Sequence, residues 1–242
     1  MAAYPGLGTI AMIWPARATV DCERLDDGLH LFSAVDPKGR RGKRHYCYLI
    51  PGAAGNVMLH PPDAPSFFEQ CRALIDAAGG VRWIFLTHDG DDSAGRAIAT
   101  DIWRAEVLAH EAELARLAIT GRGFSQDHDL DARLSVIVLP GHTAGYSCLR
   151  RRAAGGGAQF FAGHLMIRGA RGWSGAASAP LFMQSLASLR RLADLDLDAL
   201  MPEHAWSDAK GNERAPLAFD AGVRQQAVQQ AVDGLLRKAR SR

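Results

Sequence analysis

The stretch Leu139–Gly145 reads LPGHTAG and closes the apolar run Leu134–Leu139. That run predicts a β-strand, and the Pro-Gly pair after it predicts a turn. His142 therefore stands directly after the end of a strand. Loops at strand ends are where α/β folds place their ligands, so this histidine is a candidate site residue.

Three more histidines follow apolar runs in the same way, namely His88, His164 and His204. His88 is also followed, within four positions, by the carboxylates of Asp89, Asp91 and Asp92. Imidazoles that converge at strand ends beside carboxylates suit zinc or iron. Each histidine alone also has an ordinary structural explanation, and Asp92 can cap a helix that follows it. Structural or surface positions are predicted for the other histidines, which are His30, His45, His60, His110 and His128.

Apolar runs alternate with helical patterns along the whole chain. Strands are predicted at Leu29–Val35, Tyr46–Ile50, Asn56–Leu59, Trp83–Leu86, Glu106–Ala109, Leu134–Leu139, Tyr146–Leu149 and Gln159–Ala162. Helices are predicted at Pro65–Ala78, Asp92–Thr100, Leu181–Ala193 and Gly222–Lys238. Two sets of strands, each followed by helices, predict an α/β fold of sheets covered by helices on their outer faces.

The order of these motifs resembles the metallo-β-lactamase fold superfamily. The resemblance rests on Thr87-His88 with Asp92 and Gly95, on Pro140–Gly145 as its most specific part, on Gly163 and on the late His204. It covers about residues 25–206 and implies a four-layer αββα sandwich with a metal site at its open edge. We expect one such domain over residues 1–242.

The metal-binding motif of that superfamily is degenerate in this chain. The first metal position keeps His88 and His142, but Gly90 stands where the superfamily has a third histidine, and glycine cannot ligate. The second position keeps Asp92 and His204, with Ser93 in place of a histidine. This leaves two ligands at each position, below the three protein ligands usual for catalytic zinc.

The aspartate that bridges both metals in hydrolytic relatives is also changed. His164 replaces it in an ungapped comparison, or follows its deletion by one position, and Glu203 stands where relatives usually have glycine. A neutral imidazole has one lone pair and cannot bridge two ions. The resemblance therefore implies at most one ion of zinc, iron or manganese, or none. Its ligands would be His88, His142 and His164, or His164 with Asp92 and His204.

Two functions are compatible with this pattern. The first is a divergent metal-dependent hydrolase that acts on an ester, thioester, lactone or similar bond of a small molecule, with Asp92 orienting the attacking water. Asp89 or Asp91 is an alternative to Asp92 in that role. The second is a catalytically silent protein of the same fold that binds a small molecule or a protein partner without metal. The first is preferred because four metal-position residues are retained.

Composition argues against several other classes of protein. With 28 basic and 26 acidic residues the net charge is +2, which argues against a nucleic-acid or membrane-surface partner. No apolar run approaches the roughly 18 residues needed to span a bilayer. The four cysteines form no Cys-x-x-Cys pair and are expected to be reduced in the cytoplasm. A homodimer through the last predicted helix remains open.

Overall fold

The computed structural model describes residues 20–25, 28–35, 43–91, 93–169, 172–175, 177–206 and 217–240. The first sheet has the order β1 (Asp21–Arg24), β2 (His30–Val35), β3 (Lys43–Ile50), β4 (Val57–Leu59), β5 (Trp83–Phe85), β6 (Glu106–His110) and β7 (Arg122–Phe124). A further strand, β15 (His204–Trp206), pairs with β3. The second sheet has the order β16 (Leu217–Ala218), β14 (Ala199–Pro202), β11 (Ala158–Gly163), β10 (Ser147–Arg152), β9 (Leu134–Val138) and β8 (His128–Asp129).

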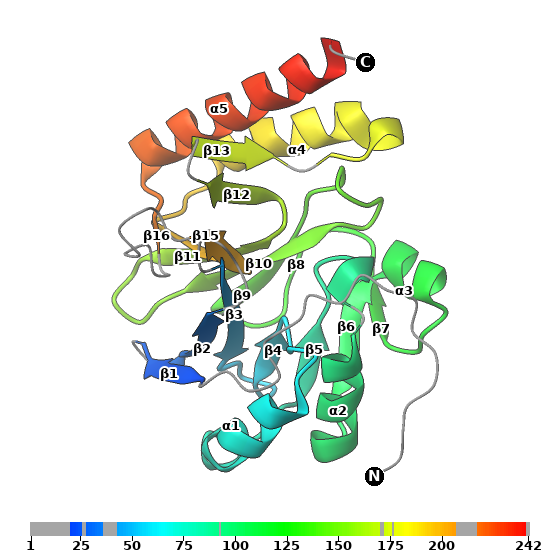
Figure 1. Cartoon of the computed structure of the whole chain (residues 1–242), viewed down its shortest axis with the longest axis vertical. Helices are drawn as coiled ribbons and strands as arrows, with labels where there is room; N and C mark the ends of the chain where they lie inside the picture. The colour runs from blue at the N-terminus through cyan, green and yellow to red at the C-terminus, as the bar shows by residue number, and fades with distance from the viewer. Residues whose placement is uncertain are drawn as a thin grey trace.

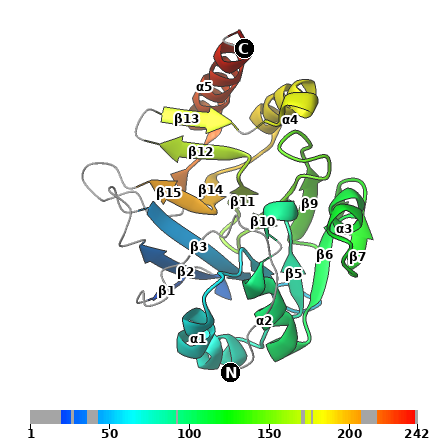
Figure 2. The same ribbon diagram turned by 45° about the vertical axis from the view of Figure 1, so that its right-hand side comes forward.

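Helices cover the outer faces of the two sheets (Figures 1 and 2). The first sheet carries α1 (Pro65–Ala77), α2 (Ala94–Trp103) and α3 (Glu111–Leu117), and the second carries α4 (Phe182–Asp194) and α5 (Ala221–Arg240). The hairpin of β12 (Met166–Gly169) and β13 (Gly172–Gly175) lies beside α5. None of these described helices is both long and apolar enough to cross a lipid bilayer.

Alternation along β3 shows why the chain forms four layers. Cys47 and Leu49 face the core beneath the outer helices, whereas Tyr46, Tyr48 and Ile50 face the second sheet. Successive side chains of a strand point to opposite faces, so a run that is apolar at every position is buried on both. The inner core is closed by contacts such as the edge-to-face pair of Tyr48 and Phe161, whose ring centroids are 5.1 Å apart. The predicted αββα sandwich is confirmed.

Parallel strands bring the candidate site residues to one edge. β4, β5 and β6 run parallel to one another, and in the second sheet β11 runs parallel to β14. The carboxyl ends of parallel neighbours meet at the same edge of a sheet. His60, His164 and Glu203 directly follow β4, β11 and β14, and His88 lies three residues after the end of β5. Residues far apart in the sequence therefore meet at this edge.

Two local predictions need correction. The helix predicted to open at Asp92 begins at Ala94, and its N-cap is Ser93, whose hydroxyl accepts a hydrogen bond from the backbone N–H of Arg96 at 3.3 Å. Helix α3 was not predicted, because its seven residues give too short an apolar pattern; its N-cap is His110, an uncommon residue for that position.

Gly95 in α2 fits closely against the segment that follows β4. A Cβ atom at this position would overlap the carbonyl oxygens of Pro61 and Pro62, which are backbone atoms and cannot turn aside. We expect Gly95→Ala to lower the free energy of unfolding by about 1–3 kcal/mol, the usual cost of overpacking. Urea denaturation checks this. The matched control is Gly155→Ala, because no atom lies within 4 Å of a Cβ there; equal stability of the two variants would contradict the close fit.

Candidate metal centre

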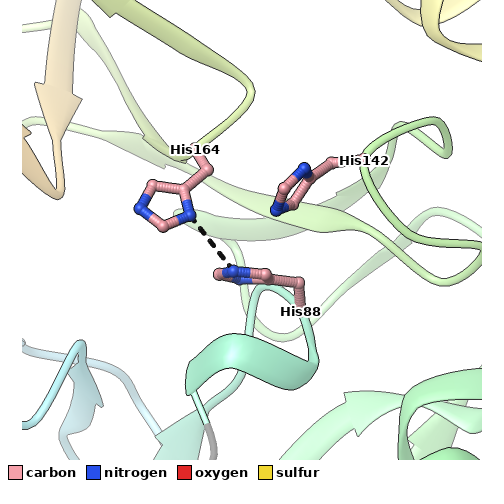
Figure 3. A group of neighbouring side chains, drawn as sticks. All are labelled: His88, His142 and His164. Atoms are coloured by element: carbon pink, nitrogen blue, oxygen red, sulfur yellow. Dashed lines mark hydrogen bonds between the residues drawn. The ribbon is translucent and has the colours of Figure 1, made fainter. Parts of the chain in front are cut away.

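Three histidines from three strand ends form a cluster. His88 follows β5, His142 lies in the loop between β9 and β10, and His164 lies in the turn after β11. One ring nitrogen of each lies within 4.8 Å of those of the other two. The rings point toward one another in Figure 3. His88 is buried, and the other two are partly exposed, so the cluster is open on one side.

The loop that carries His142 is held by both outer layers. A Cβ atom at Gly141 would lie 2.5 Å from the Cα atom of Ser185 in α4, so only glycine permits this approach. At the other end of the loop, the backbone N–H of Gly145 donates to Oε1 of the buried Glu113 of α3 at 2.8 Å. The Pro-Gly-His-Thr-x-Gly sequence is therefore a fixed turn between α3 and α4.

Hydrogen bonds set the orientation of His88. The Thr87 hydroxyl donates to Oδ2 of Asp91 at 2.6 Å, so it can only accept from Nδ1–H of His88, which lies 3.0 Å away. The same Nδ1 is 3.5 Å from Oδ1 of Asp91. Nε2 of His88 is thereby directed into the cluster, where it lies 3.2 Å from Nδ1 of His164 (Figure 3).

His164 is held in the complementary orientation. Its Nε2 lies 3.1 Å from Oε2 of Glu203, and its Nδ1 faces His88. Ligating histidines commonly have a carboxylate beside their second ring nitrogen. The separation of 3.2 Å between the two facing nitrogens is close to the roughly 3.3 Å expected between ligands on tetrahedral zinc at about 2.0–2.1 Å each. The facing nitrogens of His88 and His164 therefore have the spacing of two ligands on one ion, and His142 brings a third imidazole nitrogen within 4.8 Å.

A second group lies directly behind the histidine cluster. It consists of His60, Asp91 and Glu203, all buried, with their potential ligand atoms within 4.8 Å of one another. Nδ1 of His60 is 3.4 Å from Oδ1 of Asp91 and 3.9 Å from Oε2 of Glu203. Asp91 also accepts the backbone N–H of Thr87 at 2.6 Å. The two carboxylates thus join His60 to both His88 and His164.

Burial and nearby charges give the three clustered histidines different pKa values. Burial lowers the pKa of His88, but the carboxylates of Asp91, Glu203 and Asp89 outweigh it and raise that pKa to about 9. Burial, together with the positive charge on His88, lowers the pKa of His142 to about 4 and that of His164 to about 3. His88 is therefore the cationic member of the cluster, and its Nε2–H donates to the neutral His164.

These shifts predict how the stability of metal-free protein depends on pH. The proton on His88 contributes stability below the ordinary pKa of 6.5, and that contribution is lost as the pH rises through about 9. Below pH 6.5 the unfolded chain protonates His142 and His164, which the native state keeps neutral, so stability falls toward about pH 4. We expect a maximum near pH 6.5, checked by urea denaturation with a chelator present. A steady rise from pH 6.5 to about 8 would contradict the charge assigned to His88.

Two of the predicted site residues cannot be placed. Asp92 lies outside the described residues. His204 begins β15, and its backbone pairs with His45 of β3, but its side chain is outside the described part of the structure. The structure thus brings together His88, His142 and His164, which form the first of the two ligand sets expected from the sequence.

A structural or surface position was expected for His60. The structure places it in the buried group behind the cluster, which the sequence did not indicate. The available signal was its position after the strand preceding the His88 strand. The sequence identifies Glu203 only as a departure from the glycine usual in relatives, and Asp91 only as an alternative to Asp92. The sequence does not show that both turn inward as partners of the clustered histidines.

The absence of a side chain at Gly90 leaves room for the imidazole ring of His88. A Cβ atom at position 90 would lie 2.6 Å from Nε2 of His88, so the imidazole occupies the space that a side chain at 90 would need. In this chain the third imidazole comes from the turn after β11.

Comparison with known proteins identifies the fold. No family model matches the sequence, and no curated protein matches it. Among solved structures, a B3 metallo-β-lactamase with an active-site glutamic acid has a TM-score of 0.66 and 20% identity, covering 92% of each chain. The structure of VMB-1 has a TM-score of 0.66 and 14% identity, covering 91% of this chain and 98% of that one. FIM-1 from Pseudomonas aeruginosa, a metallo-β-lactamase in its mono-zinc form, has a TM-score of 0.63 and 14% identity, covering 89% and 97%.

Proposed function

We propose that this chain, a divergent protein with the metallo-β-lactamase fold, is a hydrolase that uses one divalent metal ion held by His88, His142 and His164. The observation that carries the proposal is the paired orientation of His88 and His164. Each has one ring nitrogen held by a polar side chain and the other directed at a common point. Zinc, iron or manganese would suit three imidazole ligands.

Charge balance supports a divalent ion. Asp91 and Glu203 are both almost completely buried, with side-chain exposures of 1% and 2%. Buried carboxylates need nearby positive charge, because their desolvation is otherwise too costly. Three neutral imidazoles around a divalent ion carry a charge of about +2, which matches the two carboxylates behind them. Without metal, imidazolium groups must supply this charge.

When bound, the metal would polarise the carbonyl of the substrate and lower the pKa of a coordinated water toward about 7. The residues of the chain have separate tasks around it. Asp91 and Glu203 keep the N–H groups of His88 and His164 turned away from the open position. Asp92 remains our candidate for orienting the water and taking its proton. Asp89 is less suited, since its Oδ2 pairs with Arg116 at 2.6 Å. We propose an ester, thioester or lactone as the substrate bond.

A competing function also has an observation in its favour. The hydrogen bond between His164 and His88 closes the cluster without any ion. A silent protein that binds a small molecule or partner without metal would have such a network.

The test is to purify the protein without chelator and measure its metal content by elemental analysis. Activity on a panel of ester, thioester and lactone substrates is then measured before and after addition of zinc, manganese or iron. We expect one equivalent of metal and an activity lost in His142→Ala. The control is His128→Ala. His128 lies on β8, outside the histidine cluster, and within the described residues its ring has one hydrogen-bonding contact, with the carbonyl of Gln126. No metal under any condition would favour the silent function.

A further inference from the structure

We propose that His60 is a positioning residue that joins the two buried carboxylates and so fixes the clustered histidines in the orientation that binds metal. The inference rests on the proposed metal centre and names a residue that supports it. The ring of His60 contacts the two carboxylates, Asp91 and Glu203. It acts through Asp91 on His88 and through Glu203 on His164.

His60 lies between the two carboxylates that contact the clustered histidines. On one side its Nδ1 lies 3.4 Å from Oδ1 of Asp91, and the same oxygen is 3.5 Å from Nδ1 of His88. On the other side that Nδ1 lies 3.9 Å from Oε2 of Glu203, which is 3.1 Å from Nε2 of His164. One N–H group thus stands between two carboxylates that each hold one ring of the cluster.

The chemistry of the two carboxylates requires such a group. Their facing oxygens lie within 4.8 Å of each other in a buried environment, where like charges repel strongly. The His60 ring, which hydrogen-bonds Asp91 and lies 3.9 Å from Oε2 of Glu203, offsets this repulsion. Without it, the two carboxylates would be expected to move apart, and each would carry its histidine partner with it. Outer residues of this kind commonly change metal affinity by about 10–100-fold.

The backbone of His60 adopts an uncommon conformation. Its φ is +53°, a left-handed conformation that side chains with a Cβ atom rarely adopt. The conformation turns the chain between β4 and the Pro61-Pro62 pair and directs the ring inward. Nε2 of His60 is buried and has no hydrogen-bond partner within the described residues. The ring is thus placed for the contacts of Nδ1 alone, at a cost that a purely packed residue would not require.

The experiment compares His60→Ala with His60→Asn. Asparagine keeps an N–H donor near the place of Nδ1 and tolerates the left-handed backbone, whereas alanine removes the donor. Zinc affinity is measured by competition with a chromophoric chelator, and urea denaturation verifies that both variants fold. We expect His60→Ala to bind one equivalent of zinc about 10–100-fold more weakly than the unchanged protein, and His60→Asn to recover most of that loss.

A second measurement separates this inference from the proposed function. In metal-free protein, ¹⁵N chemical shifts of the imidazoles report which ring nitrogen of His88 and His164 carries a proton. We expect these shifts to change in His60→Ala and to return in His60→Asn, even if the unchanged protein binds no zinc and the hydrolase proposal fails. Unchanged shifts and affinity in His60→Ala would overturn the positioning role. A second equivalent of zinc in the unchanged protein, lost in both variants, would also overturn it and make His60 a ligand.

Discussion

Replacing His164 by alanine is expected to weaken zinc binding by more than the roughly 100-fold seen when only an outer partner of a ligand is removed. The variant leaves two imidazoles, His88 and His142, where catalytic zinc sites have three protein ligands. It also takes the imidazole partner away from Oε2 of Glu203, which is buried with 2% side-chain exposure. Competition titration with a chelator measures the loss, and hydrolytic activity should disappear with it.

Companion variants identify the ligand set. His142→Ala should be as damaging as His164→Ala if the ion is held by the cluster in Figure 3. His204→Ala should then retain affinity. The reverse pattern, with His142 dispensable and His204 essential, would favour the other set expected from the sequence, namely His164 with Asp92 and His204. Retained affinity in His164→Ala would contradict both sets.

Short-range patterns predict sheets covered by helices, and the resemblance to the metallo-β-lactamase fold implies their arrangement as an αββα sandwich. The doubly buried run Trp83–Leu86 and the turn Leu139–Gly145 indicate where two strands end. The carboxyl ends of parallel neighbours such as β4, β5 and β6 meet at one edge of the sheet. The fourteen-residue pattern Pro65–Ala78 is long enough to predict a helix, which the structure places at Pro65–Ala77. The short α3 and the small strands β7 and β8 have no comparable pattern.

The residues behind the cluster could not be predicted, because their direction depends on loop conformation. Asp91 and Asp92 are neighbours in an acidic run, and only the 3₁₀ turn Asp89–Asp91 brings Asp91 inward onto Thr87. His60 depends on a left-handed backbone conformation, which a strand-end pattern does not predict. Strand-end patterns predict that a side chain is near the site. They do not show which of two adjacent residues faces it.

Gly90→Ala is expected to disrupt metal binding with little effect on folding. The new methyl group would lie 2.6 Å from Nε2 of His88, the atom directed into the cluster, and 3.1 Å from Cδ2 of the same ring. A ring end can turn aside, so the free energy of unfolding should change by less than about 1 kcal/mol, the range of well-accommodated surface substitutions. The displaced Nε2 would no longer face His164, and zinc affinity should fall about tenfold or more.

Gly157→Ala is the matched control for this variant, since a Cβ there makes only ordinary contact with Asp198 at 3.6 Å or more. Gly90→His tests the same close fit with a larger side chain. It restores the histidine of the superfamily motif, yet in this chain its side chain would have to enter the space that His88 fills. We therefore expect Gly90→His alone to weaken zinc binding as Gly90→Ala does. Tighter binding, or a second equivalent of zinc, would instead show that His88 turns freely and that its fixed orientation is not the basis of the site.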